Sequence, residues 1–447
     1  MAFLFVAALA ARLLWTLYLH PPSLYVYSDM EGYVLRAERF LAEPLGSWPD
    51  AALYPFGTHY LLALCGWVFG SVKHTGTAVV FAALGAGLAP LCFCLTGRLV
   101  TGPSWPAAAD GSAPGQLFTI ARVAGWLAVA YYPLLSLTGY YLSETPYALL
   151  LTAAALLTLR LADLGRARDA WLLGVVVALG ITFRHQLLLG LAMVLLFALW
   201  RRRSLPRLRL GLLVPVVLPI AIVLLAAAAR THHHSGRVSL VSQNASLNRV
   251  FGRCHYKLVR GRDATFGPPS FDLLDQWAHR YPWQPLKLLP AKGLELRVPV
   301  PLTDVDALND VADDCVAHTG LVRQARYALS HVALLWVDAG WPDGSQPRWL
   351  GAAQSWRRVH LVLLFVPLWI TLFAGLGKGR AREGLLGLYV WSLVLLAMLF
   401  FGSGRIRAPY DGIIIALAIG QWGRWFLRLQ GWRARRLVAE GGSAQVE

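Results

Sequence analysis

Long apolar segments recur along the whole chain, and most of them end in a short polar or basic stretch. A membrane-spanning helix needs roughly 20 apolar residues. Segments of about that length lie at residues 2–20, 77–97, 119–139, 145–162, 170–184, 186–200, 210–229, 359–377, 384–402 and 409–427. The fifth and sixth are short and meet at residues 183–186, which predicts a tight helical hairpin. The pattern predicts an all-α polytopic membrane protein with about ten transmembrane helices.

The composition agrees with a membrane protein. Hydrophobic residues make up 57% of the chain and the mean hydropathy is +0.51, above the usual apolar share of soluble domains. The net charge is +17, but the basic residues stand at the ends of apolar segments rather than on one soluble face, which argues against nucleic acid as a partner. The first segment has no basic leader and no small-residue cleavage site, so we expect a retained helix. Arg12 within it should face protein or a wet cavity.

The distribution of Lys and Arg among the short loops predicts the orientation. If the N-terminus is inside, the inner loops carry 18 of these residues and the outer segments carry 6. The inner set comprises residues 98–122, 160–169, 201–209, 378–382 and 424 onwards, and the outer set 21–75, 140–146, 184–186 and 403–408. This places the loop at 21–75 outside, in the periplasm if the membrane is a bacterial inner membrane. The long loop at 230–358 falls outside the range of the rule.

Three parts follow from this layout. We expect residues 1–229 to form a transmembrane module with a first outer loop at 21–75, residues 230–358 a large outer subdomain, and residues 359–447 the last transmembrane helices and a cytoplasmic tail. Residues 30–43 have apolar positions at helical spacing, which predicts an amphipathic helix on the outer membrane surface. Residues 54–70 are expected to dip into the outer leaflet.

Cysteines and histidines add little chemistry. Cys254 and Cys315 share the long outer loop, where an oxidising compartment would permit one bridge. His232, His233 and His234 are consecutive, so their side chains point in different directions, and we do not predict a metal site from them.

Five short stretches, taken in order, carry a family resemblance. They are Ser-Asp-Met-Glu-Gly-Tyr at 28–33, Tyr-Pro-Phe-Gly-Thr-His-Tyr-Leu-Leu-Ala-Leu at 54–64, Leu-Ser-Glu-Thr-Pro at 142–146, Thr-Phe-Arg-His at 182–185 and Gly-Arg-Ile-Arg-Ala-Pro at 404–409. Their order and sidedness resemble the polyprenol-dependent GT-C glycosyltransferases, which include the protein O-mannosyltransferases and the aminoarabinose transferase of lipid A. Two departures are evident: Met30 separates Asp29 from Glu31, and His185 stands where a proline commonly follows the arginine.

The resemblance implies an inverting transferase that moves a monosaccharide from a polyprenyl-phosphate donor to an acceptor hydroxyl on the outer face. Such a reaction needs a carboxylate base, and Asp29 is the candidate, with helix capping as the alternative role. Glu144 is expected to bind the acceptor or support the base. Glu31 lies on a different helix face from Asp29 and is either a first-turn carboxylate or a direct participant.

The leaving polyprenyl phosphate needs fixed positive groups. The candidates are Arg184, Arg405, Arg407 and His185, and the alternative for the arginines is interfacial contact with bulk lipid phosphates. No cofactor is predicted, although three carboxylates (Asp29, Glu31 and Glu144) leave a divalent cation open. The acceptor is a protein, a glycan or a lipid, and membrane lipids are further partners.

Two other classes of function stay open. A secondary transporter would have two similar halves with broken helices near the midplane, whereas here the polar groups gather at the outer ends and one long loop breaks the symmetry. A lipid-handling membrane protein without catalytic activity would tolerate amides at Asp29 and Glu144.

Overall fold

The structure is a computed structural model that describes residues 1–26, 28–105, 115–254, 264–266, 296–298, 304–337, 355–356, 359–377 and 379–442. Most of these residues are helical. The α-helices are α1 (Ala2–Leu14), α2 (Ser28–Ala42), α3 (Gly57–Phe69), α4 (Thr75–Ala86), α5 (Leu88–Thr101), α6 (Gly115–Ala130), α7 (Tyr132–Ser136), α8 (Glu144–Leu164), α9 (Ala167–Phe183), α10 (Gln186–Trp200), α11 (Leu213–Ser235), α12 (Ala245–Cys254), α14 (Val305–Val337), α16 (Val366–Leu376), α17 (Ala381–Leu399), α18 (Gly404–Arg407) and α19 (Asp411–Gly442). Two short strands, β1 (Ala264–Phe266) and β2 (Leu296–Val298), pair antiparallel.

Several short turns of 3-10 or π-helix extend or connect these helices. They are η1 (Trp15–Leu19), η2 (Pro22–Leu24), η3 (Pro49–Ala52), η4 (Gly102–Ser104), η6 (Leu137–Gly139), η7 (Leu210–Leu212), η8 (His360–Phe365) and η9 (Ala408–Tyr410).

Among the described residues, five helical segments are long and apolar enough to cross a membrane. They are Ala2–Leu24, Thr75–Ser104, Glu144–Leu164, Leu210–Ser235 and Ala381–Leu399. A sixth span results if α6 and the helical turns after it, which bend by 49° at their junction, count as one. The multi-span membrane protein expected from the sequence is therefore supported, whereas the count of about ten is not confirmed. The difference arises because apolar helices such as Gln186–Trp200 are shorter than a span.

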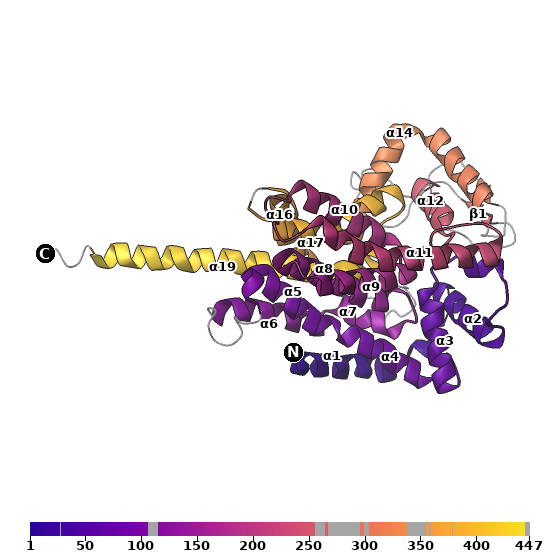
Figure 1. Cartoon of the computed structure of the whole chain (residues 1–447), viewed down its shortest axis with the longest axis horizontal. Coiled ribbons are helices and arrows are strands. Elements are labelled where there is room, and N and C mark those ends of the chain that lie inside the picture. Colours follow the sequence, from indigo (N-terminus) through magenta and orange to yellow (C-terminus); the bar gives the residue numbers. More distant parts are fainter. Residues whose placement is uncertain are drawn as a thin grey trace.

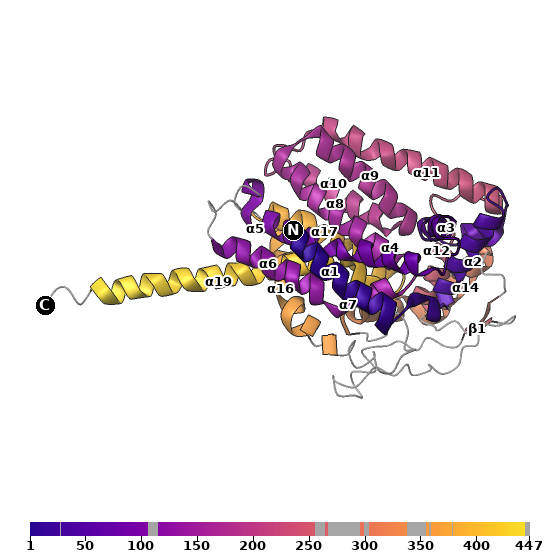
Figure 2. The ribbon, with the colours of Figure 1, turned by 90° about the horizontal axis from the view of Figure 1, so that it is seen from below.

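Helix α8 lies at the centre of the bundle and packs against α4, α5, α9 and α17 (Figure 1). Most of its residues are buried. The first loop, with α2 and α3, lies at the same end of the bundle as α12 and α14, while α19 projects from the other end (Figures 1 and 2). The start of α8 thus lies at the end of the bundle where α2, α3, α12 and α14 are found.

Arg12 faces protein, as the sequence predicts. Its side chain is fully buried and donates hydrogen bonds to the carbonyl oxygens of Ala8 and Ala128, each at 3.2 Å. The carbonyl of Ala128 is available because α6 ends two residues later. Two of the three guanidinium nitrogens thereby have backbone acceptors, while the buried Nε has no hydrogen-bond partner among the described residues.

The amphipathic helix predicted at 30–43 is confirmed as α2, but its apolar face does not lie on lipid. That face is buried against α3 and the segment before α8. The buried α2 residues in this cluster are Met30, Tyr33, Val34 and Ala37. The periodicity identified the helix correctly, but periodicity alone does not distinguish a protein partner from a membrane surface.

The predicted outer subdomain at 230–358 is described only in part. Helix α12 packs along α14, and α14 contains a kink at Gly320, whose φ of 72° suits glycine. The second half of α14 follows this kink and ends at Val337. The predicted bridge from Cys254 to Cys315 involves the Cys254 side chain, which lies outside the described side chains.

Candidate functional site

Four charged residues that are far apart in the sequence meet at the end of the bundle where α8 begins. Asp29 lies in the first turn of α2, Glu144 is the first residue of α8, Arg184 lies in the turn between α9 and α10, and Arg405 lies on α18. All four were candidates from the sequence. We call them the outer charged cluster.

Local sequence places these residues at chain turns. Pro146 follows Glu144 in the first turn of α8, a position where its missing N–H costs nothing. Arg184 has extended backbone between two helices, which matches the tight hairpin predicted at 183–186. The Ser403 side chain accepts a hydrogen bond from the Ile406 amide and so caps α18.

Glu144 is fully buried and anchors both arginines. Its Oε1 lies 2.6 Å from Nη2 of Arg184 and 2.5 Å from Nε of Arg405. The Ser143 hydroxyl donates to Oε2 of Glu144 at 3.2 Å and accepts from Nε of Arg184 at 2.9 Å. A buried carboxylate is tolerable only with such partners, so this arrangement fixes both guanidinium groups.

Asp29 is the exposed member of the cluster, with 32% of its side chain accessible. Its Oδ2 lies 2.9 Å from Nη1 of Arg405, and its Oδ1 accepts a hydrogen bond from the Tyr54 hydroxyl at 3.2 Å. Because α2 begins at Ser28, Asp29 is a first-turn residue and its carboxylate is engaged elsewhere, so the capping alternative is not supported.

Arg405 joins the two carboxylates. Burial alone would lower its pKa, but Glu144 and Asp29 outweigh burial and raise the pKa. Arg184 and Arg405 are 14% and 24% exposed at their side chains, which does not fit side chains extended to bulk lipid. Within the described part of the chain, Nη1 of Arg184 and Nη2 of Arg405 have no hydrogen-bond partner. Two N–H-bearing nitrogens therefore remain for an anion.

Two tyrosines border Asp29. Burial, then the charge of Asp29, raises the pKa of Tyr54, and burial, Asp29 and Glu144 raise the pKa of Tyr33 to about 12. Both phenols are therefore neutral donors at neutral pH. Tyr54 begins the matching stretch at 54–64, but no role was predicted for it.

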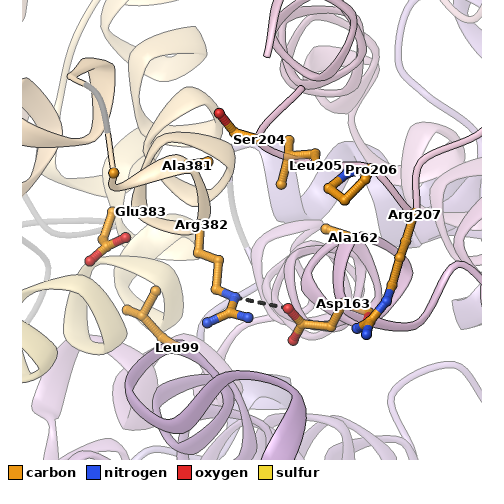
Figure 3. A pocket seen from close by; sticks show the side chains of 11 residues that line it. Leu99, Ala162, Asp163, Ser204, Leu205, Pro206, Arg207, Ala381, Arg382 and Glu383 are labelled. Carbon is orange, nitrogen blue, oxygen red and sulfur yellow. Dashed lines mark hydrogen bonds and ion pairs between the residues drawn. The ribbon is translucent and has the colours of Figure 1, made fainter. Parts of the chain in front are cut away.

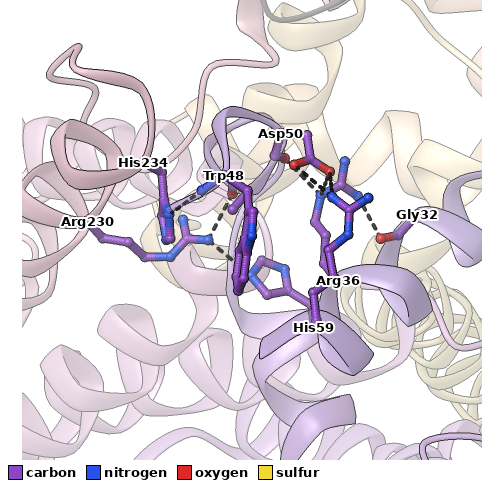
Figure 4. Close-up of polar contacts among 9 residues, drawn as sticks. Gly32, Arg36, Trp48, Asp50, His59, Arg230 and His234 are labelled. Carbon is purple, nitrogen blue, oxygen red and sulfur yellow. Dashed lines mark hydrogen bonds and ion pairs between the residues drawn. The ribbon is translucent and has the colours of Figure 1, made fainter. Parts of the chain in front are cut away.

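The first loop is held by hydrogen bonds from arginine side chains, most of them to backbone carbonyl oxygens (Figure 4). Arg36 donates to the carbonyl oxygens of Asp50 and Gly32, both at 2.8 Å. Arg230 of α11 donates to the carbonyl oxygen of Ala51 at 2.8 Å and contacts Nε2 of His59 at 3.1 Å. These contacts hold η3 against α2 and α11, and so fix Tyr54 and Asp29 relative to one another.

Three other residues predicted for the site do not belong to the outer charged cluster. Glu31 is exposed and makes no hydrogen bond or ion pair with the described residues. Arg407 is buried, pairs with Asp411 at 3.1 Å and donates to the Leu335 carbonyl oxygen at 2.9 Å, so it joins α18 to α19 and α14. His185 follows Arg184, and burial together with that arginine lowers its pKa to about 4, which makes the imidazole neutral at neutral pH.

The divalent-cation alternative gains no support from the donor geometry. Among the described residues, no group of three or more His, Cys, Asp or Glu side chains is placed to hold a metal ion. Arg405 lies between Asp29 and Glu144 instead, and Glu31 is exposed.

Comparison with known proteins adds no family. No family model matches the chain, and no curated protein sequence matches it. The function must therefore be inferred from the outer charged cluster itself.

Proposed function

We propose that this protein transfers a monosaccharide from a polyprenyl-phosphate donor to an acceptor hydroxyl on the outer face of the membrane, with inversion and with Asp29 as the base. The observation that carries the proposal is the shared arginine: Arg405 contacts both the buried Glu144 and the accessible Asp29. The Arg405 guanidinium therefore lies between Asp29, which can accept a proton, and the space beside Arg184, where an anion can bind.

The donor phosphate would meet the nitrogens that Glu144 leaves unused. Because Glu144 anchors Arg184 and Arg405, Nη1 of Arg184 and Nη2 of Arg405 are held in position for phosphate oxygens. Guanidinium groups suit this task because they donate in a planar fork. The arginines meet the charge that grows on the phosphate as the anomeric C–O bond breaks, in a site with little water to screen them.

The proposed base, Asp29, contacts Nη1 of Arg405, whereas Glu144 contacts Nε of the same side chain. Each Asp29 oxygen has one protein partner and can accept another hydrogen bond. The acceptor hydroxyl gives its proton to Asp29 while its oxygen bonds to the anomeric carbon. The bonding electrons of the broken C–O bond leave with the polyprenyl phosphate, and attack from the face opposite the phosphate inverts the anomeric centre.

The finer architecture belongs to the same proposal. We take α9, α10, the η8–α16 unit and α19 as further membrane-embedded helices, which gives about ten in a GT-C type arrangement. We place the protein in a bacterial inner membrane with the outer charged cluster facing the periplasm or exterior. A protein, a glycan or a lipid serves as acceptor.

The deciding experiment supplies the purified protein in nanodiscs with polyprenyl-phosphate sugars and follows release of the lipid phosphate. Asp29→Asn should lower turnover by about 10²–10⁴-fold, the usual contribution of a general base. Glu31→Gln, a matched control two residues away with an exposed side chain, should stay within about twofold of wild type.

Both variants must elute and melt like wild type for the comparison to count. Turnover of Asp29→Asn above a tenth of wild type would contradict its role as base. Solute flux across sealed vesicles without any release of lipid phosphate would favour a transporter instead.

A further inference from the structure

A second charged site lies at the other end of α8. About 30 Å of helix separates Glu144 from Asp163. Asp163 lines a pocket of about 450 Å³ between the ends of α5 and α8, the segment before η7, and the start of α17 (Figure 3). Its walls include Leu99, Leu205, Arg207 and Arg382. This Asp163 pocket shares no residue with the outer charged cluster.

The carboxylates of the pocket are already paired. Asp163 is 3% exposed, with Oδ1 2.8 Å from Nε of Arg382 and Oδ2 3.4 Å from Nε of Arg98. Glu383 pairs with Arg424 at 2.8 Å. Neither acid therefore needs a cation from outside.

Arg207 has no carboxylate partner in the described part of the chain. Its guanidinium contacts the main-chain oxygen of Asp163, and in Figure 3 it extends beside Asp163 on the side opposite Arg382. Two guanidinium groups thus flank one paired carboxylate. The lining holds two arginines and two acids, and the paired Arg98 and Arg424 behind it bring the immediate surroundings to four arginines against two acids. The local excess of positive charge favours an anion.

The backbone makes room for this arrangement. Gly102 has a φ of 68°, and a Cβ at this position would collide with the Arg382 guanidinium. A side chain here would be strained and would displace Arg382 from the pocket. Glycine therefore both permits the turn and leaves space for the charged group.

The position of the pocket identifies the source of the anion. The pocket lies at the end of α8 and the start of α17. Both helices are long enough to span the membrane, so this is the level at which lipid head groups lie. The adjoining segment 201–209 contains five arginines and no acidic residue. Basic pockets between transmembrane helices are suited to anionic head groups, and Leu99 and Leu205 offer apolar contact to the start of an acyl chain.

We propose that the Asp163 pocket binds the phosphate group of an anionic phospholipid, with Arg207 and Arg382 as its donors, on the membrane face opposite the outer charged cluster. Guanidinium groups pair well with phosphate oxygens. The pocket volume is in the range of small-molecule sites. This assignment does not depend on the proposed transferase activity.

The test measures lipid binding to the full-length protein in detergent by native mass spectrometry, with phosphatidylglycerol against phosphatidylcholine and inorganic phosphate as a separate arm. Wild type should bind phosphatidylglycerol saturably and in preference to phosphatidylcholine. Arg207→Gln should weaken this binding about tenfold, which corresponds to ~1.4 kcal/mol. Arg203→Gln removes the same charge from an exposed residue of the same segment that does not line the pocket, and should change binding less than twofold.

Arg207→Gln is the safer variant because Arg207 pairs with no buried carboxylate. Arg382→Gln would instead remove the closer of the two arginine partners of Asp163 and leave only Arg98. Equal losses in Arg207→Gln and Arg203→Gln would overturn the pocket in favour of diffuse surface attraction. Inorganic phosphate that binds as tightly as the lipid, with the same dependence on Arg207, would overturn the assignment to lipid.

Discussion

The two ends of α8 both bury a carboxylate, but the charged residues around that carboxylate differ. Each end carries a buried carboxylate, Glu144 or Asp163, held by two arginines from other elements. At the Glu144 end, one of those arginines reaches on to a second, accessible carboxylate, Asp29. At the Asp163 end, no accessible carboxylate continues from the ion pairs among the described residues. The pocket there is lined instead by Arg207, which has no carboxylate partner, and by Glu383, which pairs with Arg424. Our proposal therefore assigns chemistry to the Glu144 end, where an accessible carboxylate continues the network of ion pairs, and anion binding to the Asp163 end.

The strongest test of this difference replaces each buried acid by its amide. Glu144→Gln should lower turnover per folded molecule about 100-fold, because both guanidinium groups lose their anchor and small misplacements in a site are costly. Asp163→Asn should leave turnover within about twofold, since it lies about 30 Å away. Turnover in the nanodisc assay, normalised to monodisperse protein, checks this. An equal loss in both variants would remove the distinction between the ends.

A smaller effect is expected when one arginine is changed at each end. Arg184→Lys keeps the charge but loses the planar fork, so we expect the KM for the polyprenyl-phosphate donor to rise about tenfold. Arg98→Lys, at the Asp163 end, should leave that KM unchanged. Initial rates over a range of donor concentrations measure both. A donor KM that stays at the wild-type value in Arg184→Lys would remove Arg184 from donor binding.

The smallest effect concerns pH. Burial and Arg184 lower the pKa of His185 from 6.5 to about 4, so between these pH values the unfolded chain binds more protons than the folded one. Stability should therefore fall as pH drops from about 6.5 to about 4, with a slope of at most ~1.4 kcal/mol per pH unit from this group. His185→Gln should flatten that part of the stability curve, measured by thermal melting in detergent.

The exposed His74 provides the control for this measurement. His74→Gln should keep the pH slope of wild type, although it removes the side chain that caps α4. An unchanged slope in His185→Gln would show that His185 is accessible to protons in the folded protein.

The residues of the outer charged cluster could be predicted from the sequence one by one, but the ion pairs between them could not. Loop position and side of the membrane selected Asp29, Glu144, Arg184 and Arg405. The contact of residue 29 with residue 405 is not encoded in any local pattern, because it depends on how α2 and α18 pack. For the same reason Arg407, two residues from Arg405, was expected beside it but lies against Asp411.

The Asp163 pocket was missed, although one signal was present. Asp163 lies in the last turn of α8, where the helix dipole disfavours an acid. A carboxylate that is buried at this end of a helix needs cationic partners. One of them is Arg98, which lies in the last turn of α5. The count of about ten spans is not confirmed, because apolar length in the sequence does not show how far helices such as α10 extend across the membrane.

The shared oxygen of Glu144 has a consequence for how this protein can vary. Because Oε1 serves both Arg184 and Arg405, a substitution at any of the three positions alters at least one ion pair on which another residue depends. Their effects should be strongly non-additive. In diverged descendants of this sequence, these three positions should therefore be inherited as one unit, changing together or not at all, while Glu31 drifts freely.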